Sequence, residues 1–202
     1  MYWKIASLLI FAIFCGWSYI EIQLKNRRDE KLEEAFWDRE NKANSVRRKP
    51  IDHLDYIYIP KELPLININD KVEMPYLLET IEKLRNEKIL NLTGYSNTDL
   101  KLEYGTANIS ELSLYDQNYT TLVTTLQKLV DIYIPEGLEN EAVSIMEFMV
   151  STNCDIGKTY RLLGKYYLKN GMSAKYEELL AAAENIPSLN KKYIIDSLKN
   201  LA

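Results

Sequence analysis

The 202-residue sequence contains little glycine and proline, seven and six residues respectively, and only one histidine and two cysteines. Few helix breakers favour a helical fold. His53 is the only histidine, and Cys15 and Cys154 lie far apart in the chain, so the sequence lacks the ligand set of a zinc site and the parts of a Ser–His or Cys–His catalytic pair. A disulfide framework is equally disfavoured. We therefore predict two free thiols, no metal, no cofactor and no enzymatic activity.

Positive charge is also in short supply. The formal net charge is −4, and acidic residues outnumber basic ones beyond residue 50. Nucleic-acid binding depends on clustered cations that contact phosphates, so we expect no nucleic-acid partner. The hydrophobic content of 47% is sufficient for a packed core.

The N-terminus contains one long uncharged run, residues 5–20 (IASLLIFAIFCGWSYI). At roughly 1.5 Å per residue a helix of this length spans about 24 Å, slightly less than a bilayer core of about 30 Å. Trp3 and Trp17 lie near its two ends, as in interfacial aromatic belts. We predict a single-pass membrane anchor over residues 1–24 that contacts the lipid bilayer through residues 5–20.

Two other interpretations of this run stay open. A cleaved signal peptide needs small residues before the cleavage site, which Gly16 and Ser18 could supply. A lipoprotein signal ending at Cys15 would have the bulky Phe14 where a small residue is required. The cations that follow the run (Lys25, Arg27, Arg28 and Lys31) predict by the positive-inside rule that the body lies in the cytoplasm.

The stretch between the anchor and the body divides in two. Residues 25–49 have no glycine or proline and predict a charged juxtamembrane helix, either a solvated stalk or a lipid-contacting segment. Residues 50–73 contain Pro50, Pro60 and Pro64 and predict an extended linker lying across the helical body, residues 74–202. The body begins with a helix over residues 74–90 and a brief helix over 98–104 that ends at Gly105.

A shift of the chain by 34 residues superposes two stretches without a gap. Tyr133 then falls on Tyr167, and Gly137 falls on Gly171. The pattern predicts two helix–turn–helix copies, residues 123–156 and 157–190, covered by a capping helix over 190–201.

The second copy resembles a tetratricopeptide (TPR) repeat. The residues that carry the resemblance are Tyr160, Leu163, Gly164, Tyr167, Gly171, Leu180 and Ala183. Tyr176 stands where that family has a small residue, and Val130 replaces the glycine in the first copy. The resemblance implies a stack of antiparallel helix pairs whose first helices line a groove for extended peptides. Together with the apolar run, we expect an all-α fold in which a transmembrane helix precedes this stack.

Gly157, Lys158 and Thr159 form a triplet like the end of a phosphate-binding loop. Such a loop needs another glycine at position 152, which is Thr, and a buried strand before it. The triplet instead predicts the start of a repeat's first helix.

One cationic face is the candidate binding site. Lys158, Arg161, Lys165 and Lys169 share one side of the predicted helix, and Lys128 could extend the charge onto the previous copy. We expect this face to bind a protein or peptide partner, an acidic segment in particular, which makes the chain a membrane-anchored interaction or scaffold module.

Two alternatives to this function stay open. The cationic face could be an ordinary solvated surface, or residues 51–66 could occupy the groove themselves in a self-closed structural protein. An unrecognised enzyme is a third class, for which no residue gives a lead.

Overall fold

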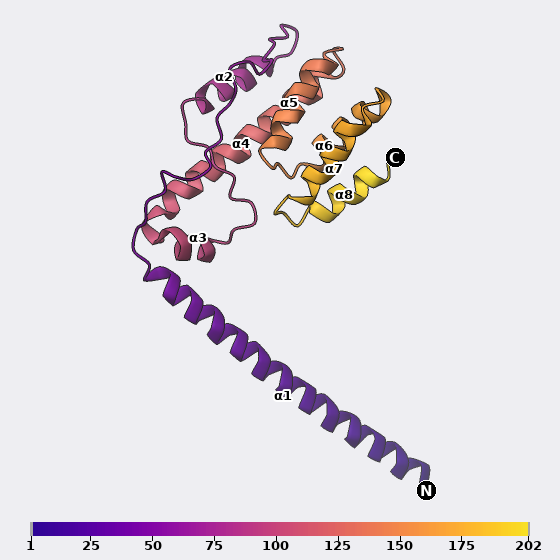
Figure 1. Cartoon of the computed structure of the whole chain (residues 1–202). Coiled ribbons are helices and arrows are strands. Elements are labelled where there is room, and N and C mark those ends of the chain that lie inside the picture. The colour runs from indigo at the N-terminus through magenta and orange to yellow at the C-terminus, as the bar shows by residue number, and fades with distance from the viewer. Residues whose placement is uncertain (1, 202) are drawn as a thin grey trace. The chain divides into compact units, whose positions relative to one another are not determined.

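The regular elements of the described structure are helices, joined by turns and loops (Figure 1). The computed structural model describes residues 2–201, with side chains for all of these except residues 2, 4–10 and 12. No strand occurs over residues 2–201, which confirms the all-α prediction. The elements are α1 (Tyr2–Asn44), α2 (Met74–Leu84), α3 (Asn97–Tyr104), the 3-10 turn η1 (Thr106–Asn108), α4 (Ile109–Tyr133), α5 (Glu139–Ser151), α6 (Gly157–Lys169), α7 (Ser173–Glu184) and α8 (Lys191–Lys199).

The helices group into two compact units. Unit 1 comprises Met1–Lys49 and Asn97–Ala107, and unit 2 comprises Pro50–Ser96 and Asn108–Ala202. Residues 97–107, which the sequence analysis placed in the helical body, therefore group with α1.

Unit 1 consists of α1 and the short α3. α1 runs without a break from the apolar N-terminus through the charged stretch and ends at Asn44, before the predicted boundary at residue 49. Its C-terminal end is fixed to α3, because the Glu40 carboxylate accepts hydrogen bonds from Thr98 and Lys101. Ala43 is fully buried at this contact end of the helix. The predicted brief helix that ends at Gly105 is confirmed by α3.

The predicted anchor is described only in part, since residues 4–10 and 12 lie outside the side chains described. Among the described residues, no helix combines the length and the apolar character needed to cross a bilayer.

Unit 2 is a series of helices in which each packs on the next. α2 packs on α4, α4 on α5, α5 on α6, and α6 on both α7 and α8. The predicted helix over 74–90 is wrong in its C-terminal part, because α2 ends at Leu84. The Ile89 carbonyl accepts a hydrogen bond from the Ile57 amide at 2.9 Å, and the Leu90 amide donates to the Tyr115 carbonyl at 3.2 Å. Partners elsewhere in the chain thus replace helical hydrogen bonds here.

The two predicted copies end their first helices in the same way. Gly137 has φ of 79° and Gly171 has φ of 67°, the left-handed conformation that glycine adopts without steric cost. After each glycine, the next amide donates to a carbonyl five residues back: Leu138 to Tyr133 at 3.0 Å and Met172 to Tyr167 at 2.9 Å. This is a Schellman turn in both copies. The turn geometry therefore repeats with the 34-residue period of the sequence.

Close packing around α6 explains why Gly164 and Tyr167 occupy their positions. A Cβ atom on Gly164 would lie 2.8 Å from Leu198 Cδ2, so the absence of a side chain allows α8 to approach α6. Tyr167 is buried, and its hydroxyl donates to Glu147 of α5 at 2.7 Å. Ile194 and Leu198 of α8 are fully buried, as a capping helix requires, whereas Tyr193 is 66% exposed.

The segment before α2 packs on the helices rather than standing free. Ile59 and Leu63 belong to the core, and the Tyr133 hydroxyl donates to the Ile66 carbonyl at 2.9 Å. The Arg85 guanidinium donates to the Pro60 carbonyl at 3.2 Å. The linker was expected to lie across the helical body. Residues 57–66 do lie along it, beside α2 and the C-terminal end of α4.

Candidate functional site

A small apolar hollow lies between α5 and α6, with a volume of about 160 Å³. Val143 and Met146 form the α5 side, three residues apart on one face of that helix. Leu162 and Tyr166 form the α6 side at a spacing of four, which places them one above the other. We call this hollow the α5–α6 groove.

Charged side chains form the rim of the α5–α6 groove. Lys165 and Lys169 of α6 line it from one side, and Glu139 at the start of α5 lines it from the other. Lys169 Nζ lies 3.6 Å from Glu139 Oε1, an exposed pair that contributes less than about 1 kcal/mol. Arg161 and Lys165 form no ion pair within residues 2–201. Lys165 on the rim, and Arg161 one turn before it on α6, are therefore available to an incoming carboxylate.

The first residue of the predicted face, Lys158, has a different role. Lys158 Nζ donates to Asp131 Oδ2 of α4 at 2.7 Å, and the Gln127 amide donates to Asp131 Oδ1 at 2.9 Å. The Thr159 hydroxyl donates to Gln127 Oε1 at 2.7 Å, where both side chains are buried. Lys158 and Thr159 thus fix the first turn of α6 to α4.

This network also accounts for the Gly157–Lys158–Thr159 triplet. Gly157 is the first residue of α6, as the sequence predicted. Its lysine and threonine contact a neighbouring helix, and the residues before the triplet form a turn rather than a strand.

The predicted site residues are therefore divided in space. Lys165 and Lys169 lie at the α5–α6 groove, Arg161 lies exposed one turn before Lys165, and Lys158 pairs with Asp131. Lys128 is exposed on α4 and is not part of the groove lining. Sequence reasoning found the cations but missed the apolar hollow beside them. The i, i+4 spacing of Leu162 and Tyr166 was the signal that could have indicated it.

A larger hollow of about 530 Å³ lies between α2 and α4. Much of its lining is charged or amide side chains, including Glu79, Lys83, Glu87, Gln117 and Asn118. Charges of both signs occur there, and nothing in the lining favours one ligand chemistry. The α5–α6 groove is the stronger candidate because its floor is apolar, and because Lys165 and Lys169 outnumber Glu139 on its rim.

The thiols do not form a reactive centre. Cys154 is 1% exposed, and burial raises the pKa of its thiol to about 12, so the nucleophilic thiolate is scarce at neutral pH. Cys15 is exposed on α1, and both cysteines are free, as predicted. Within the described part of the chain, no three His, Cys, Asp or Glu side chains converge as metal ligands would.

One half-buried carboxylate, with a side chain that is 39% exposed, joins three helices. Glu147 of α5 accepts hydrogen bonds from Tyr167 of α6 and Lys175 of α7, each at 2.7 Å. Burial raises the pKa of Glu147, but the hydrogen bonds from Lys175 and Tyr167 outweigh it, so the pKa lies below its usual value. This site links α5, α6 and α7, and Glu147 is not part of the groove lining.

Comparisons with known proteins add no relative. No protein-family model, no curated protein and no solved structure matches this chain. The resemblance to tetratricopeptide repeats therefore stays a prediction from the residues quoted above.

Proposed function

We propose that the chain is a membrane-anchored interaction module that binds a peptide or protein segment at the α5–α6 groove. The observation that supports this proposal is the combination of an apolar hollow with two cations, Arg161 and Lys165, that have no ion-pair partner in the described structure. A segment with one apolar side chain and neighbouring carboxylates fits this combination, because Lys and Arg form charge-assisted hydrogen bonds with carboxylates.

Site-specific photo-crosslinking in intact membranes tests this function. A photoreactive phenylalanine analogue at Tyr166, in the groove, should give protein adducts whose captured peptides are acidic and contain an apolar residue. The same analogue at Tyr193, 66% exposed on α8, is the matched control and should not give these adducts.

Charge reversal supplies the second arm of the same test. Arg161→Glu with Lys165→Glu should abolish the adducts at position 166, whereas Lys192→Glu with Lys199→Glu on exposed α8 positions should preserve them. Adducts that survive reversal of Arg161 and Lys165 would show that the groove cations do not bind the partner.

We further propose that residues 5–20 anchor the chain in a bilayer with the body in the cytoplasm. Large apolar side chains on the described part of this run are about two-thirds exposed, for example Phe14 at 66% and Trp17 at 67%. Such a row of exposed apolar groups is unfavourable in water and favourable in lipid. Alkaline carbonate should leave the chain in the membrane pellet, and protease added outside intact cells should spare the body. Release by carbonate, or digestion of the body from outside, would contradict the anchor or its orientation.

A self-closed structural protein is the second candidate, and the packing of residues 57–66 favours it. Ile59 and Leu63 are each 8% exposed within the core. No contact of this segment with the α6 cations is among the described interactions. Its hydrogen bonds are to Arg85, just after α2, and to Tyr133 of α4, and it lines a separate hollow with Asn140, Ser144 and Phe148 of α5. Deletion of residues 51–66 distinguishes the two functions: loss of folding indicates structural packing, whereas a folded chain that gains adducts at position 166 indicates an internal plug.

A further inference from the structure

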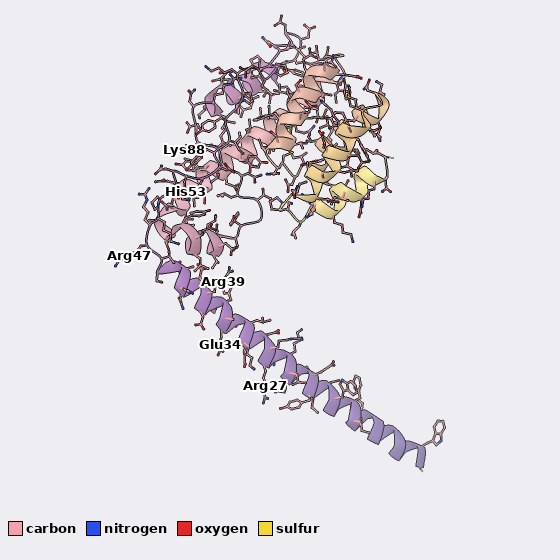
Figure 2. All side chains as sticks on the ribbon, in the orientation of Figure 1. Arg27, Glu34, Arg39, Arg47, His53 and Lys88 are labelled. Atoms are coloured by element: carbon pink, nitrogen blue, oxygen red, sulfur yellow. The ribbon has the colours of Figure 1, made fainter. Side chains whose placement is uncertain are left out.

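One side of α1 carries carboxylates and an exposed tryptophan, which complement the cations and the apolar hollow of the α5–α6 groove. Glu30, Glu34 and Asp38 follow one another at a spacing of four, so they lie on one side of the helix, and all three are exposed. Glu33 and Trp37 share this side, and the Trp37 indole donates to Glu33 at 3.4 Å. Figure 2 shows Glu34 projecting from α1. We call these five residues the acidic face of α1.

The three carboxylates of this face have no ion-pair partner in the described structure, although Arg27, Lys31 and Lys42 lie three or four residues away on the same helix. Glu30, Glu34 and Asp38 form no ion pair within residues 2–201, and Lys31 is the only basic residue in the stretch 30–38. Like charges four residues apart destabilise a helix. A cationic surface laid against the acidic face would relieve that repulsion.

The spacing of the charges on α6 matches that of the acidic face. Arg161, Lys165 and Lys169 are also spaced by four, so both sets place charges about 6 Å apart along a helix axis. Glu34 and Lys165 are the middle charges of the two sets. If they face each other, the outer charges also face each other, whether the two helices run parallel or antiparallel.

The aromatic residue of the acidic face also matches the hollow in size. Trp37 is 54% exposed on α1, although a large aromatic side chain is favoured in buried sites. The hollow of the α5–α6 groove measures about 160 Å³ and is lined by Val143, Met146 and Leu162. Apolar cavities of about 150 Å³ accept a benzene ring. One ring of the indole therefore fits, next to the cations that would pair with Glu34 and Asp38.

We infer that the occupant of the α5–α6 groove is the acidic face of α1 from a second copy of this chain. This inference rests on the proposed function of the groove and names its ligand. In such a complex Trp37 enters the hollow, and two of the three carboxylates pair with Arg161 and Lys165. The third pairs with Lys169, which exchanges its exposed contact with Glu139 for it.

A disulfide between two different chains tests the inference. Both chains carry Cys15→Ser, which removes the exposed thiol and leaves the buried Cys154. One chain also carries Glu34→Cys with one tag, and the other carries Lys165→Cys with a second tag. Co-expressed full chains are oxidised in intact membranes with a copper–phenanthroline reagent. We expect a product with both tags at twice the chain mass.

The matched control replaces Lys165→Cys by Lys192→Cys, an exposed lysine on α8, and should give at least tenfold less mixed product. Absence of a mixed product, equal yield with the control, or a product linking only two Glu34→Cys chains would overturn the inference. A crosslink confined to a single chain carrying both cysteines would overturn it as well.

Charge exchange provides an independent readout. Glu34→Lys or Lys165→Glu alone should weaken self-association at least tenfold in sedimentation of the full chain in detergent, and a chain carrying both should recover it. Failure of recovery would contradict direct pairing. If self-association is absent while position 166 still gives adducts that depend on Arg161 and Lys165, the proposed function stands and this inference falls. If those adducts are absent too, the groove is not a binding site.

Discussion

Replacing the turn glycine in each copy by alanine should destabilise the helix stack by similar amounts. Gly137 and Gly171 have φ of 79° and 67°, and nothing lies within 4 Å of a Cβ atom placed on either. A new methyl group therefore meets no clash, and only the backbone conformation matters. The left-handed conformation costs a residue with a side chain about 1–2 kcal/mol. Alanine also restricts the unfolded chain, which returns about 0.4–1 kcal/mol.

The net loss of unfolding free energy should thus be about 1 kcal/mol for Gly137→Ala and about the same for Gly171→Ala. The two turns belong to different copies and share no contact, so the double variant should lose about 2 kcal/mol. Asparagine tolerates this conformation better than alanine, so Gly171→Asn should lose less than Gly171→Ala. A change of 1 kcal/mol corresponds to a shift of about 2–4 °C in the midpoint for a chain of this size.

Thermal unfolding of the full chain in a mild detergent, followed by far-UV circular dichroism, measures these effects. Gly16→Ala on α1 is the control, because Gly16 is helical and a Cβ there meets nothing within 4 Å. It should leave the unfolding of unit 2 unchanged. If Gly171→Ala destabilises the chain and Gly137→Ala does not, the two turns are not equivalent, and the reasoning from a duplicated helix pair is refuted.

Three further predictions concern packing, protonation and reactivity. Gly164→Ala should lower the free energy of unfolding by about 1 kcal/mol. The new methyl group would lie 2.8 Å from Leu198, and such overpacking costs about 1–3 kcal/mol, whereas the higher helix propensity of alanine returns about 1 kcal/mol. A stabilised variant would contradict this. The pKa of Glu147 is lowered in the fold, so its stabilising effect is present above the ordinary carboxyl pKa near 4.5 and is lost as pH falls below it. The difference in stability between the parent chain and Glu147→Gln should accordingly shrink from pH 7 to pH 3, and a constant difference would refute it. Maleimide should modify Cys15 alone in the native chain and Cys154 only after denaturation, as mass spectrometry will show; rapid native labelling of Cys154 would contradict its burial.

The features that could be predicted from the sequence are those that depend on local spacing. Gly137 and Gly171 lie at equivalent positions of a repeat, and left-handed turns favour glycine. The ends of the first helix in both copies could therefore be predicted from these positions. Contacts between distant residues could not be inferred in this way. Ile89 and Leu90 continue the apolar pattern of α2. The Ile89 carbonyl instead accepts from Ile57, and the Leu90 amide donates to Tyr115, which the pattern cannot indicate.

The candidate site shows the same division. A cationic row on α6 can be read from spacing alone, because residues three or four apart share a helix face. The pairing of Lys158 with Asp131, and the hollow beside Lys165, depend on how α6 packs on α4 and α5. The distinction between a structural lysine and one available for binding therefore required the tertiary structure.

The bonds between α3 and Glu40 have a practical consequence for shortening this protein. A fragment beginning at residue 50 would keep α3 but lose the helix that it packs on, so Thr98 and Lys101 would lose their carboxylate partner and Leu100, 5% exposed in the whole chain, would lose neighbours. Such a fragment is expected to associate through α3 whatever its groove binds. Truncations that start before residue 39, or that also remove residues 97–107 with a short replacement loop, avoid that artefact.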